Sequence, residues 1–399
     1  MKTSTRTARA AVSGTVKLAD TARTMIATGH DVIELSEGEP DFDTPAHIVD
    51  AAHQAAKAGH TRYTAVAGTP ALREQIVRKF ELQNQIVCDL EQVVVGTGAK
   101  QLIFNALLAT IDTGDEVIIP APYWVSYPDM VKVADGTPVI VHCDSAHGLK
   151  ISPKQLSNAI TDRTCWLILN SPGNPSGAVY SRSELEGLAE VLRAHPDVAV
   201  LSDDIYEEIV FAGTKFSTMA EVAPDLADRI LTVNGVSKSF AMTGWRIGYA
   251  CGPAKLIAEM VKLQGQSTTN ASSVGQAAAQ AALSGPRDFL SDWLDAYTRR
   301  REIVMDRLSA VPGLVLTQPA GAFYVFPDCR ALLGKHSTDV GRLEDDYGVS
   351  QFLLECAGVA LVPGSEFGAP GHLRLCFAKS DVELIDACDR IKDACESLA

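Results

Sequence analysis

One lysine and one arginine stand eight residues apart in an otherwise apolar stretch of this chain. Lys238 follows the apolar run 230–236, and Arg246 precedes a second apolar run. Lysine forms Schiff bases with aldehydes, and the planar guanidinium of arginine binds phosphate. Most such pairs are solvated surface charges, but charges in apolar surroundings need partners. The pair therefore indicates a ligand that carries both an aldehyde and a phosphate ester.

Other polar residues follow apolar runs that predict strands. Asp203 ends one such run, Tyr206 comes three residues later, and Asn174 lies in a Pro/Gly-rich turn after another run. A carboxylate can pair with a protonated pyridine nitrogen, and an amide or a phenol can hydrogen-bond a phenolic oxygen. Pyridoxal phosphate (PLP) offers all these groups with an aldehyde and a phosphate. Plainer roles stay open, because such carboxylates also cap helices and Pro/Gly turns often bind nothing.

A second phosphate contact is expected where the run 93–95 leads into a predicted helix. Gly98 and Ala99 are small enough for a phosphate to approach the backbone, and Lys100 follows them. The N-terminus of a helix presents free N–H groups and the positive end of the helix dipole. A strand-to-helix turn without a ligand uses the same residues. The Rossmann glycine spacing and the P-loop pattern are both missing.

These residues need a scaffold, and the middle of the chain predicts one. Helix-period segments near 100–110, 123–134 and 183–194 alternate with predicted strands near 93–95, 116–120, 138–142, 165–170, 198–202, 230–234 and 247–251. This alternation predicts an α/β domain with a largely parallel sheet. Ligands bind beyond the carboxyl ends of the strands in such a sheet, which is where the polar residues fall.

The pattern changes after about residue 285. A long charged helix is predicted over 288–310, then strands near 322–326, 359–362 and 373–377 and helices near 351–356 and 382–397. We expect a large cofactor-binding domain over 45–285 and a smaller α+β domain formed by 1–44 and 286–399.

Composition limits the classes of partner. The chain has 399 residues and a net charge of −14, which argues against nucleic acid and anionic membrane surfaces. It shows no apolar span of membrane length and no signal-peptide pattern. Its nine cysteines are scattered without CxxC pairs, so neither a disulfide framework nor a zinc site is expected. These features predict a cytoplasmic enzyme without a metal.

Several longer motifs occur in order along the chain. They are Gly-Glu-Pro-Asp-Phe-Asp-Thr-Pro at 38–45, Pro-Tyr-Trp-Val-Ser-Tyr-Pro at 122–128, Asn-Pro-Ser-Gly at 174–177 and Gly-Ala-Phe-Tyr at 321–324. Together with the 237–249 stretch, they resemble the class I and II aminotransferases, which are PLP enzymes of fold type I. The resemblance runs from about Ala11 to the C-terminal helix and is closest to the aspartate/prephenate aminotransferase subgroup. It implies a large domain with a mostly parallel, seven-stranded sheet.

The resemblance implies a cofactor role for each matching residue. Lys238 resembles the Schiff-base lysine that also moves the substrate proton, and Asp203, rather than Asp204, has the family's spacing to Tyr206. The other expected cofactor contacts are Asn174 and Tyr206 at the phenolic oxygen, Trp124 on the ring, and Arg246, Ser237, Gly98, Ala99 and Lys100 around the phosphate. Tyr63 matches a tyrosine that reaches the phosphate of a neighbouring subunit, which implies a homodimer with shared active sites.

The substrate contacts are also implied by the resemblance. Arg374 matches the arginine that binds the α-carboxylate, and the backbone of Gly38 lines the same site with Trp124 and Asn174. Lys100, helped by Ser13 and Thr15, matches the group that binds a distal carboxylate. A ping-pong transfer between aspartate or glutamate and a 2-oxo acid such as 2-oxoglutarate is therefore expected. Aromatic amino acids, prephenate or a broad substrate range stay open.

One residue departs from the subgroup's pattern. Glu37 stands where a small residue is usual before the glycine. Its carboxylate can repel a distal carboxylate, pair with Lys100 or point outward. If it faces the site, a neutral, hydroxyl-bearing or cationic donor is favoured. Two less favoured functions also remain, a PLP lyase or decarboxylase and a non-catalytic PLP-binding protein.

Overall fold

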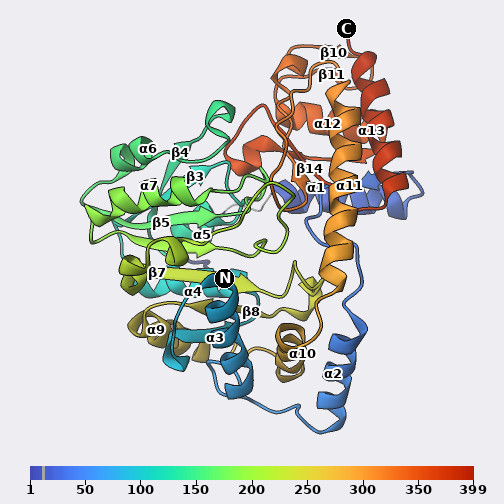
Figure 1. Cartoon of the computed structure of the whole chain (residues 1–399). Coiled ribbons are helices and arrows are strands. Elements are labelled where there is room, and N and C mark those ends of the chain that lie inside the picture. The colour runs from blue at the N-terminus through green and yellow to red at the C-terminus, as the bar shows by residue number, and fades with distance from the viewer. Residues whose placement is uncertain (11–13) are drawn as a thin grey trace.

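A seven-stranded sheet forms the centre of the larger part of the molecule (Figure 1). The computed structural model describes residues 1–10 and 14–399, and side chains outside 11–19. The strands are β2 Val93–Gly96, β3 Glu116–Ala121, β4 Thr137–His142, β5 Thr164–Asn170, β6 Ala199–Asp203, β7 Ile230–Gly235 and β8 Gly248–Cys251. Their order is β2-β8-β7-β6-β5-β3-β4. Strand β8 runs opposite to the other six, which are parallel to one another. The predicted mostly parallel sheet is confirmed.

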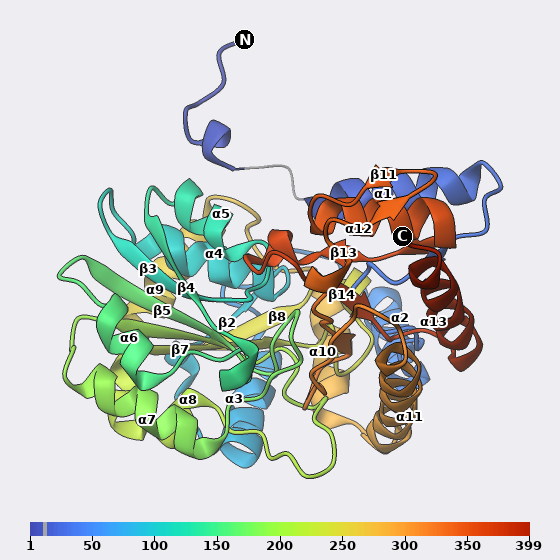
Figure 2. The same cartoon turned by 90° about the horizontal axis from the view of Figure 1, so that it is seen from above.

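Helices cover both faces of this sheet, as Figure 2 shows. The helices around it are α2 Ala46–Lys57, α3 Pro70–Asn84, α4 Ala99–Thr110, α5 Tyr127–Val133, α6 Pro153–Ala159, α7 Arg182–Arg193, α8 Met219–Val222, α9 Ala254–Gly265 and α10 Ser273–Ser284. Alternate strand residues pack to opposite sides, as a period of two requires. Val94 packs with α4 and α9, whereas Val93 and Val95 pack with α2, α3 and α10. The sequence pattern had not indicated α2, α3, α6, α8, α9 and α10.

The C-terminal part forms the predicted smaller α+β layer. It contains α11 Phe289–Ser309, α12 Asp346–Ala357, α13 Asp381–Glu396, the sheet β13-β14-β9 (Val362–Pro363, Leu373–Cys376, Tyr324–Val325) and the hairpin β10 His336–Ser337 with β11 Gly341–Arg342. The N-terminal segment joins it, because β1 Ile33–Glu34 pairs with β12 Val359–Ala360 and α1 Gly14–Ala27 packs Ala22 against Leu354 and Ala360. The domain limits near 44 and 285 stay a prediction.

A buried polar cluster ties the end of α3 to the segment after β6. Lys79 Nζ donates to Asn84 Oδ1 at 2.6 Å and to the Glu207 carboxylate, and Asn84 Nδ2 donates to Glu207 Oε2 at 2.7 Å. All three residues are buried. A buried charge is tolerated only when it is paired. The cluster therefore fixes the backbone next to Asp203 and Tyr206 only as long as every member is present.

We expect Lys79→Met to lower the free energy of unfolding by about 3–5 kcal/mol, because it leaves the Glu207 carboxylate buried without its cation. Urea unfolding measures this change. Lys262→Met is the matched control, since Lys262 pairs with Glu259 on the exposed face of α9 and such pairs contribute little. Equal losses in the two variants would contradict a structural role for the buried cluster.

Within the residues that the structure describes, no helix is long and apolar enough to cross a membrane. The same residues contain no group of three or more His, Cys, Asp and Glu side chains that could hold a metal ion.

Candidate active site

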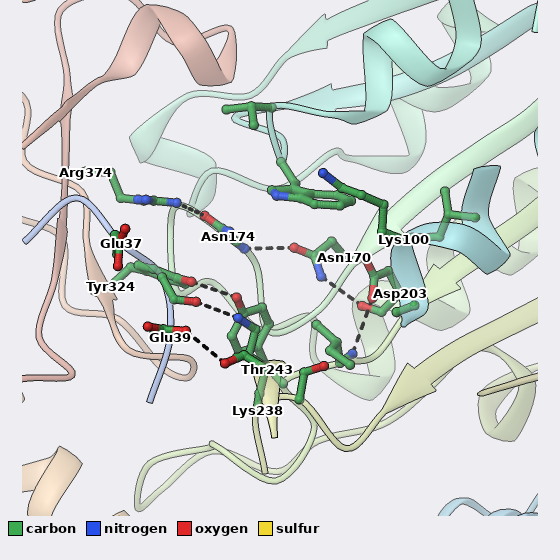
Figure 3. Close-up of a pocket in the computed structure, with 18 of the residues that line it drawn as sticks. Glu37, Glu39, Lys100, Asn170, Asn174, Asp203, Lys238, Thr243, Tyr324 and Arg374 are labelled. Carbon is green, nitrogen blue, oxygen red and sulfur yellow. Dashed lines mark hydrogen bonds between the residues drawn. The ribbon is translucent and has the colours of Figure 1, made fainter. Parts of the chain in front are cut away.

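The polar residues at the strand ends meet in one cavity of about 570 Å³, between the large sheet and the smaller domain (Figure 3). Most of the predicted site residues line it: Gly38, Ala99, Lys100, Trp124, Asn174, Asp203, Tyr206, Ser237, Lys238, Arg246 and Arg374. Gly98 lies directly beside it, against Arg246. Ser13 and the side chain of Thr15 lie outside the described residues.

Lys238 is a half-buried amine of the cavity. It follows β7, and its Nζ donates to the carbonyl oxygen of Gly38 at 2.5 Å. Burial lowers the pKa of Lys238 to about 8, because the low-dielectric surroundings disfavour the ammonium form. A larger fraction of this lysine than of an exposed one is therefore neutral near physiological pH, and the neutral amine is the form that acts as nucleophile and proton acceptor.

Asp203 is the buried acid of the cavity. It ends β6, and its Oδ2 accepts a hydrogen bond from the Tyr127 hydroxyl at 2.6 Å. Burial raises the pKa of Asp203 to about 6, and the hydrogen bond from Tyr127 opposes this rise. Asp204 instead accepts from the Ser202 hydroxyl at 2.7 Å and does not line the cavity. The structure thus brings Asp203 to the site, as the spacing to Tyr206 predicts.

Arg246 and the N-terminus of α4 form a cradle for an anion. A Cβ atom on Gly98, whose φ is 82°, would lie 2.6 Å from Arg246 Nη2, so only glycine lets the arginine come this close. The first N–H groups of a helix have no acceptor within the helix. Lys100 extends from the first turn of α4, and its Nζ lies 4.8 Å from the centre of the Trp124 ring. Burial and Arg246 lower the pKa of Lys100.

Arg374 lies on β14 at the other end of the cavity. Its Nη1 donates to Asn174 Oδ1 at 3.0 Å, and its Nη2 donates to the carbonyl oxygen of Ser36. The guanidinium is buried above the rings of Tyr324 and Phe367, at 4.9 and 5.0 Å from their centres. Its Nε has no hydrogen-bond partner among the described residues. A buried guanidinium without a carboxylate partner suits a carboxylate of a bound molecule.

Arg23, which lines the cavity, and four residues that hold predicted site residues in place were not singled out from the sequence. Asn170 joins two of the predicted residues, because its Nδ2 donates to the carbonyl oxygen of Asp203 at 2.9 Å and its Oδ1 accepts from the Asn174 N–H at 2.8 Å. The hydroxyls of Tyr206 and Tyr324 lie 2.7 Å apart. The Tyr127 hydroxyl donates to Asp203, and the Ser36 carbonyl oxygen accepts from Arg374. Tyr127 and Tyr324 stand within recognised motifs, and Asn170 ends a predicted strand, so a signal existed for three of the four.

The donors and acceptors of the cavity fit an aldehyde-phosphate with a pyridine ring. Lys238 offers an amine for the aldehyde, Asp203 offers a carboxylate for a ring N–H, and Arg246 with the α4 N-terminus offers a phosphate site. Arg374 then remains for a second anionic molecule. The arrangement can hold such a cofactor and an α-carboxylate together in one cavity.

Tyr63 lies apart from these residues. Its side chain is 87% exposed, and it borders a separate surface recess with Arg62, Thr268 and Asn270. Within one subunit the structure does not bring it to the cavity.

We expect Tyr127→Phe to weaken cofactor binding about tenfold, since a hydrogen bond to a charged group contributes about 1.5 kcal/mol. Losing it raises the pKa of Asp203 further and lets the carboxylate turn. Fluorescence titration of the apoprotein with PLP measures the affinity. Tyr180→Phe is the matched control, because the Tyr180 hydroxyl is also buried but contacts the Ile151 N–H. An unchanged affinity in Tyr127→Phe would contradict this role.

Comparisons with known proteins agree with this geometry. The family model "Aminotransferase class I and II" matches residues 30–391. An aspartate/prephenate aminotransferase of Cereibacter sphaeroides is 50% identical over 98% of both chains, and an aspartate aminotransferase of Rhizobium meliloti is 48% identical over 97% of this chain and 95% of its own.

Two solved structures have nearly the same fold. The aspartate aminotransferase from Rhizobium meliloti superposes with a TM-score of 0.97 at 47% identity and full coverage of both chains. The Thermus thermophilus aspartate aminotransferase with maleate superposes with a TM-score of 0.92 at 41% identity, over 99% of this chain and all of its own. The predicted fold type is therefore confirmed.

Proposed function

Because this chain belongs to the class I and II aminotransferase family, we propose that it moves an amino group between aspartate or glutamate and a 2-oxo acid such as 2-oxoglutarate, with PLP as its cofactor, by a ping-pong mechanism. The observation that carries this proposal is the convergence of Lys238, Asp203 and Arg374 on one cavity. An amine, a ring-nitrogen partner and an α-carboxylate site are the parts that amino transfer requires.

The proposed roles of the cofactor residues follow from their positions. When bound, PLP supplies an aldehyde and a ring that accepts an electron pair from the substrate Cα. Lys238 would hold the cofactor. As a free neutral amine it would then take the proton from the substrate Cα and deliver it to the cofactor carbon that had carried the aldehyde. Asp203 keeps a proton on the ring nitrogen, with Tyr127 and Asn170 holding it in place. Arg246, Ser237, Gly98, Ala99 and Lys100 would hold the phosphate, Trp124 would contact the ring, and Asn174 and Tyr206 would hydrogen-bond the phenolic oxygen.

The proposed substrate contacts lie on both sides of the reacting carbon. Arg374 binds the α-carboxylate, beside the backbone of Gly38 and the amide of Asn174. Lys100, aided by Thr15 and Ser13, binds a side-chain carboxylate from the opposite end. The relatives named as aspartate aminotransferases support this choice. The relative named aspartate/prephenate aminotransferase supports prephenate as a second acceptor.

The proposed assembly is a homodimer with shared active sites. Tyr63 is a large aromatic side chain that lies almost fully exposed on a single subunit. A second copy that received this side chain at its phosphate site would explain that exposure. A cytoplasmic location is also proposed, since the described cysteines are all free.

Single-turnover experiments test the function. The PLP-loaded protein is mixed with one amino acid at a time, without an acceptor, and the released 2-oxo acid is counted. We expect about one 2-oxo acid per subunit and the fastest release from aspartate or glutamate. Continuous release of product without an acceptor would indicate a lyase, and no release from any amino acid would indicate a non-catalytic PLP-binding protein.

A further inference from the structure

Glu37 lies between Ser36 and Gly38, whose backbone oxygens contact Arg374 and Lys238. The carbonyl oxygen of Ser36 accepts from Arg374, and the carbonyl oxygen of Gly38 accepts from Lys238. The Glu37 side chain is 40% exposed, and Glu37 is among the residues that line the cavity. In the view of Figure 3 it lies on the side that carries Arg374, away from Lys100. A substrate held by Arg374 and next to Lys238 therefore shares this cavity with Glu37.

The partner of Glu37 is Arg23, not Lys100. Arg23 Nη2 lies 3.5 Å from Glu37 Oε1, and Arg23 also lines the cavity. The two segments that carry the pair are held by the fold, because both contact Ala360. Ala22, next to Arg23 on α1, packs against Ala360, and the Leu35 N–H donates to the Ala360 carbonyl oxygen at 3.1 Å. Helix α1 and the segment 35–37 therefore keep their relative position.

Glu37 differs from the other carboxylates of the cavity. Asp203 accepts from Tyr127 at 2.6 Å, and Glu39 accepts from the Thr243 hydroxyl at 2.8 Å. The contact between Glu37 and Arg23 is longer, and the Arg23 side chain is 56% exposed. Arg23 also lies 3.5 Å from Asp20 on its own helix. Such an open ion pair is weak and can be rearranged by an incoming charge.

We propose that Glu37 and Arg23 together set the enzyme's preference between dicarboxylic and uncharged amino acids, an inference that rests on the proposed amino transfer. Glu37 repels both carboxylates of a dicarboxylic substrate but only the α-carboxylate of an uncharged one, and Arg23 offsets that repulsion. An uncharged substrate side chain has no net charge interaction with Glu37 or Arg23. The pair thus lets one cavity accept both substrate classes. Removing either residue would change the preference between dicarboxylic and uncharged amino acids.

The test compares Glu37→Gln, Arg23→Gln and the double variant with the parent. For each, kcat/KM is measured with aspartate and with alanine. Glu37→Gln should raise the aspartate-to-alanine ratio about fivefold, which corresponds to about 1 kcal/mol for one charge near another at the surface. Arg23→Gln should lower the ratio by a similar factor, and the double variant should return to within about twofold of the parent. These shifts should shrink in 1 M salt, where exposed charges are screened.

A binding measurement separates charge from catalysis. Calorimetric titration of the holoenzyme with maleate, a dicarboxylate without an amino group, should give a lower Kd for Glu37→Gln and a higher Kd for Arg23→Gln. Glu190→Gln is the matched control, because Glu190 is an exposed carboxylate that pairs with Arg193 far from the cavity. It should change neither the ratio nor the Kd.

The outcomes distinguish the two proposals. If the parent releases no 2-oxo acid from any amino acid, the proposed function itself is wrong. If the parent transfers amino groups but Glu37→Gln changes kcat/KM equally for aspartate and alanine, Glu37 acts on the shared α-carboxylate and the specificity inference is wrong. A ratio unchanged in both single variants overturns it as well.

Discussion

Replacing Lys238 with alanine is expected to reduce the rate of amino transfer by at least about 10⁴-fold, because it removes the nucleophile and the proton carrier together. Lys238 is half-buried, and its Nζ is held on the Gly38 carbonyl oxygen at 2.5 Å. No other lysine among the described residues that line the cavity has a comparable position, since Lys100 lies over the Trp124 ring. Single-turnover release of a 2-oxo acid measures the loss.

The same variant should lose the covalent attachment of PLP. After borohydride reduction, mass spectrometry should find the cofactor on the peptide that contains Lys238 in the parent and on no peptide in Lys238→Ala. Lys255→Ala, an exposed lysine at the start of α9, is the matched control and should retain both activity and attachment. Native turnover by Lys238→Ala would refute the proposed mechanism.

Asp203→Asn is expected to reduce kcat by about 10²–10³-fold, the range seen when one preorganised electrostatic group is removed from an active site. The carboxylate lies in a fully buried position, where an unscreened charge is most effective. An amide of the same shape keeps the packing but cannot hold a proton on the ring nitrogen. Steady-state kinetics with saturating PLP measure the change.

Asp204→Asn is the matched control for Asp203→Asn. Asp204 is also buried, and burial raises its pKa to about 7, but its side chain contacts Ser202 and not the cavity. Its substitution should lower stability while leaving kcat within a few-fold of the parent. The opposite ranking of the two variants would show that the ring-nitrogen partner has been assigned to the wrong carboxylate.

The sequence alone determined the strands and the residues that end them. Apolar runs predicted all seven strands of the large sheet, because buried parallel strands are short and apolar throughout. Asp203, Asn174 and Lys238 were identified because each follows such a strand, and strand ends on one edge of a sheet meet in space. The resemblance to the family, whose aspartate lies three residues before its tyrosine, also favoured Asp203 over Asp204, and the structure brings Asp203 to the cavity.

Only the tertiary structure decided how these residues are tuned. The hydrogen bonds from Tyr127 to Asp203, from Asn170 to Asp203 and from Arg374 to Ser36 join different segments of the chain. Local sequence patterns report on neighbours along the chain and carry no information about such long-range contacts. The lowered pKa of Lys238 and the raised pKa of Asp203 have the same origin, since burial in the folded molecule produces both.

Glu37 shows what the sequence could predict and what required the tertiary structure. The sequence showed a carboxylate at a position next to the expected substrate, but it left three orientations open. The fold places it on the cavity wall and gives it Arg23 as a partner, because α1 and the segment before Gly38 both rest on Ala360. Sequence therefore determined which chemical groups the site contains, and packing between distant segments decided which of those groups face one another.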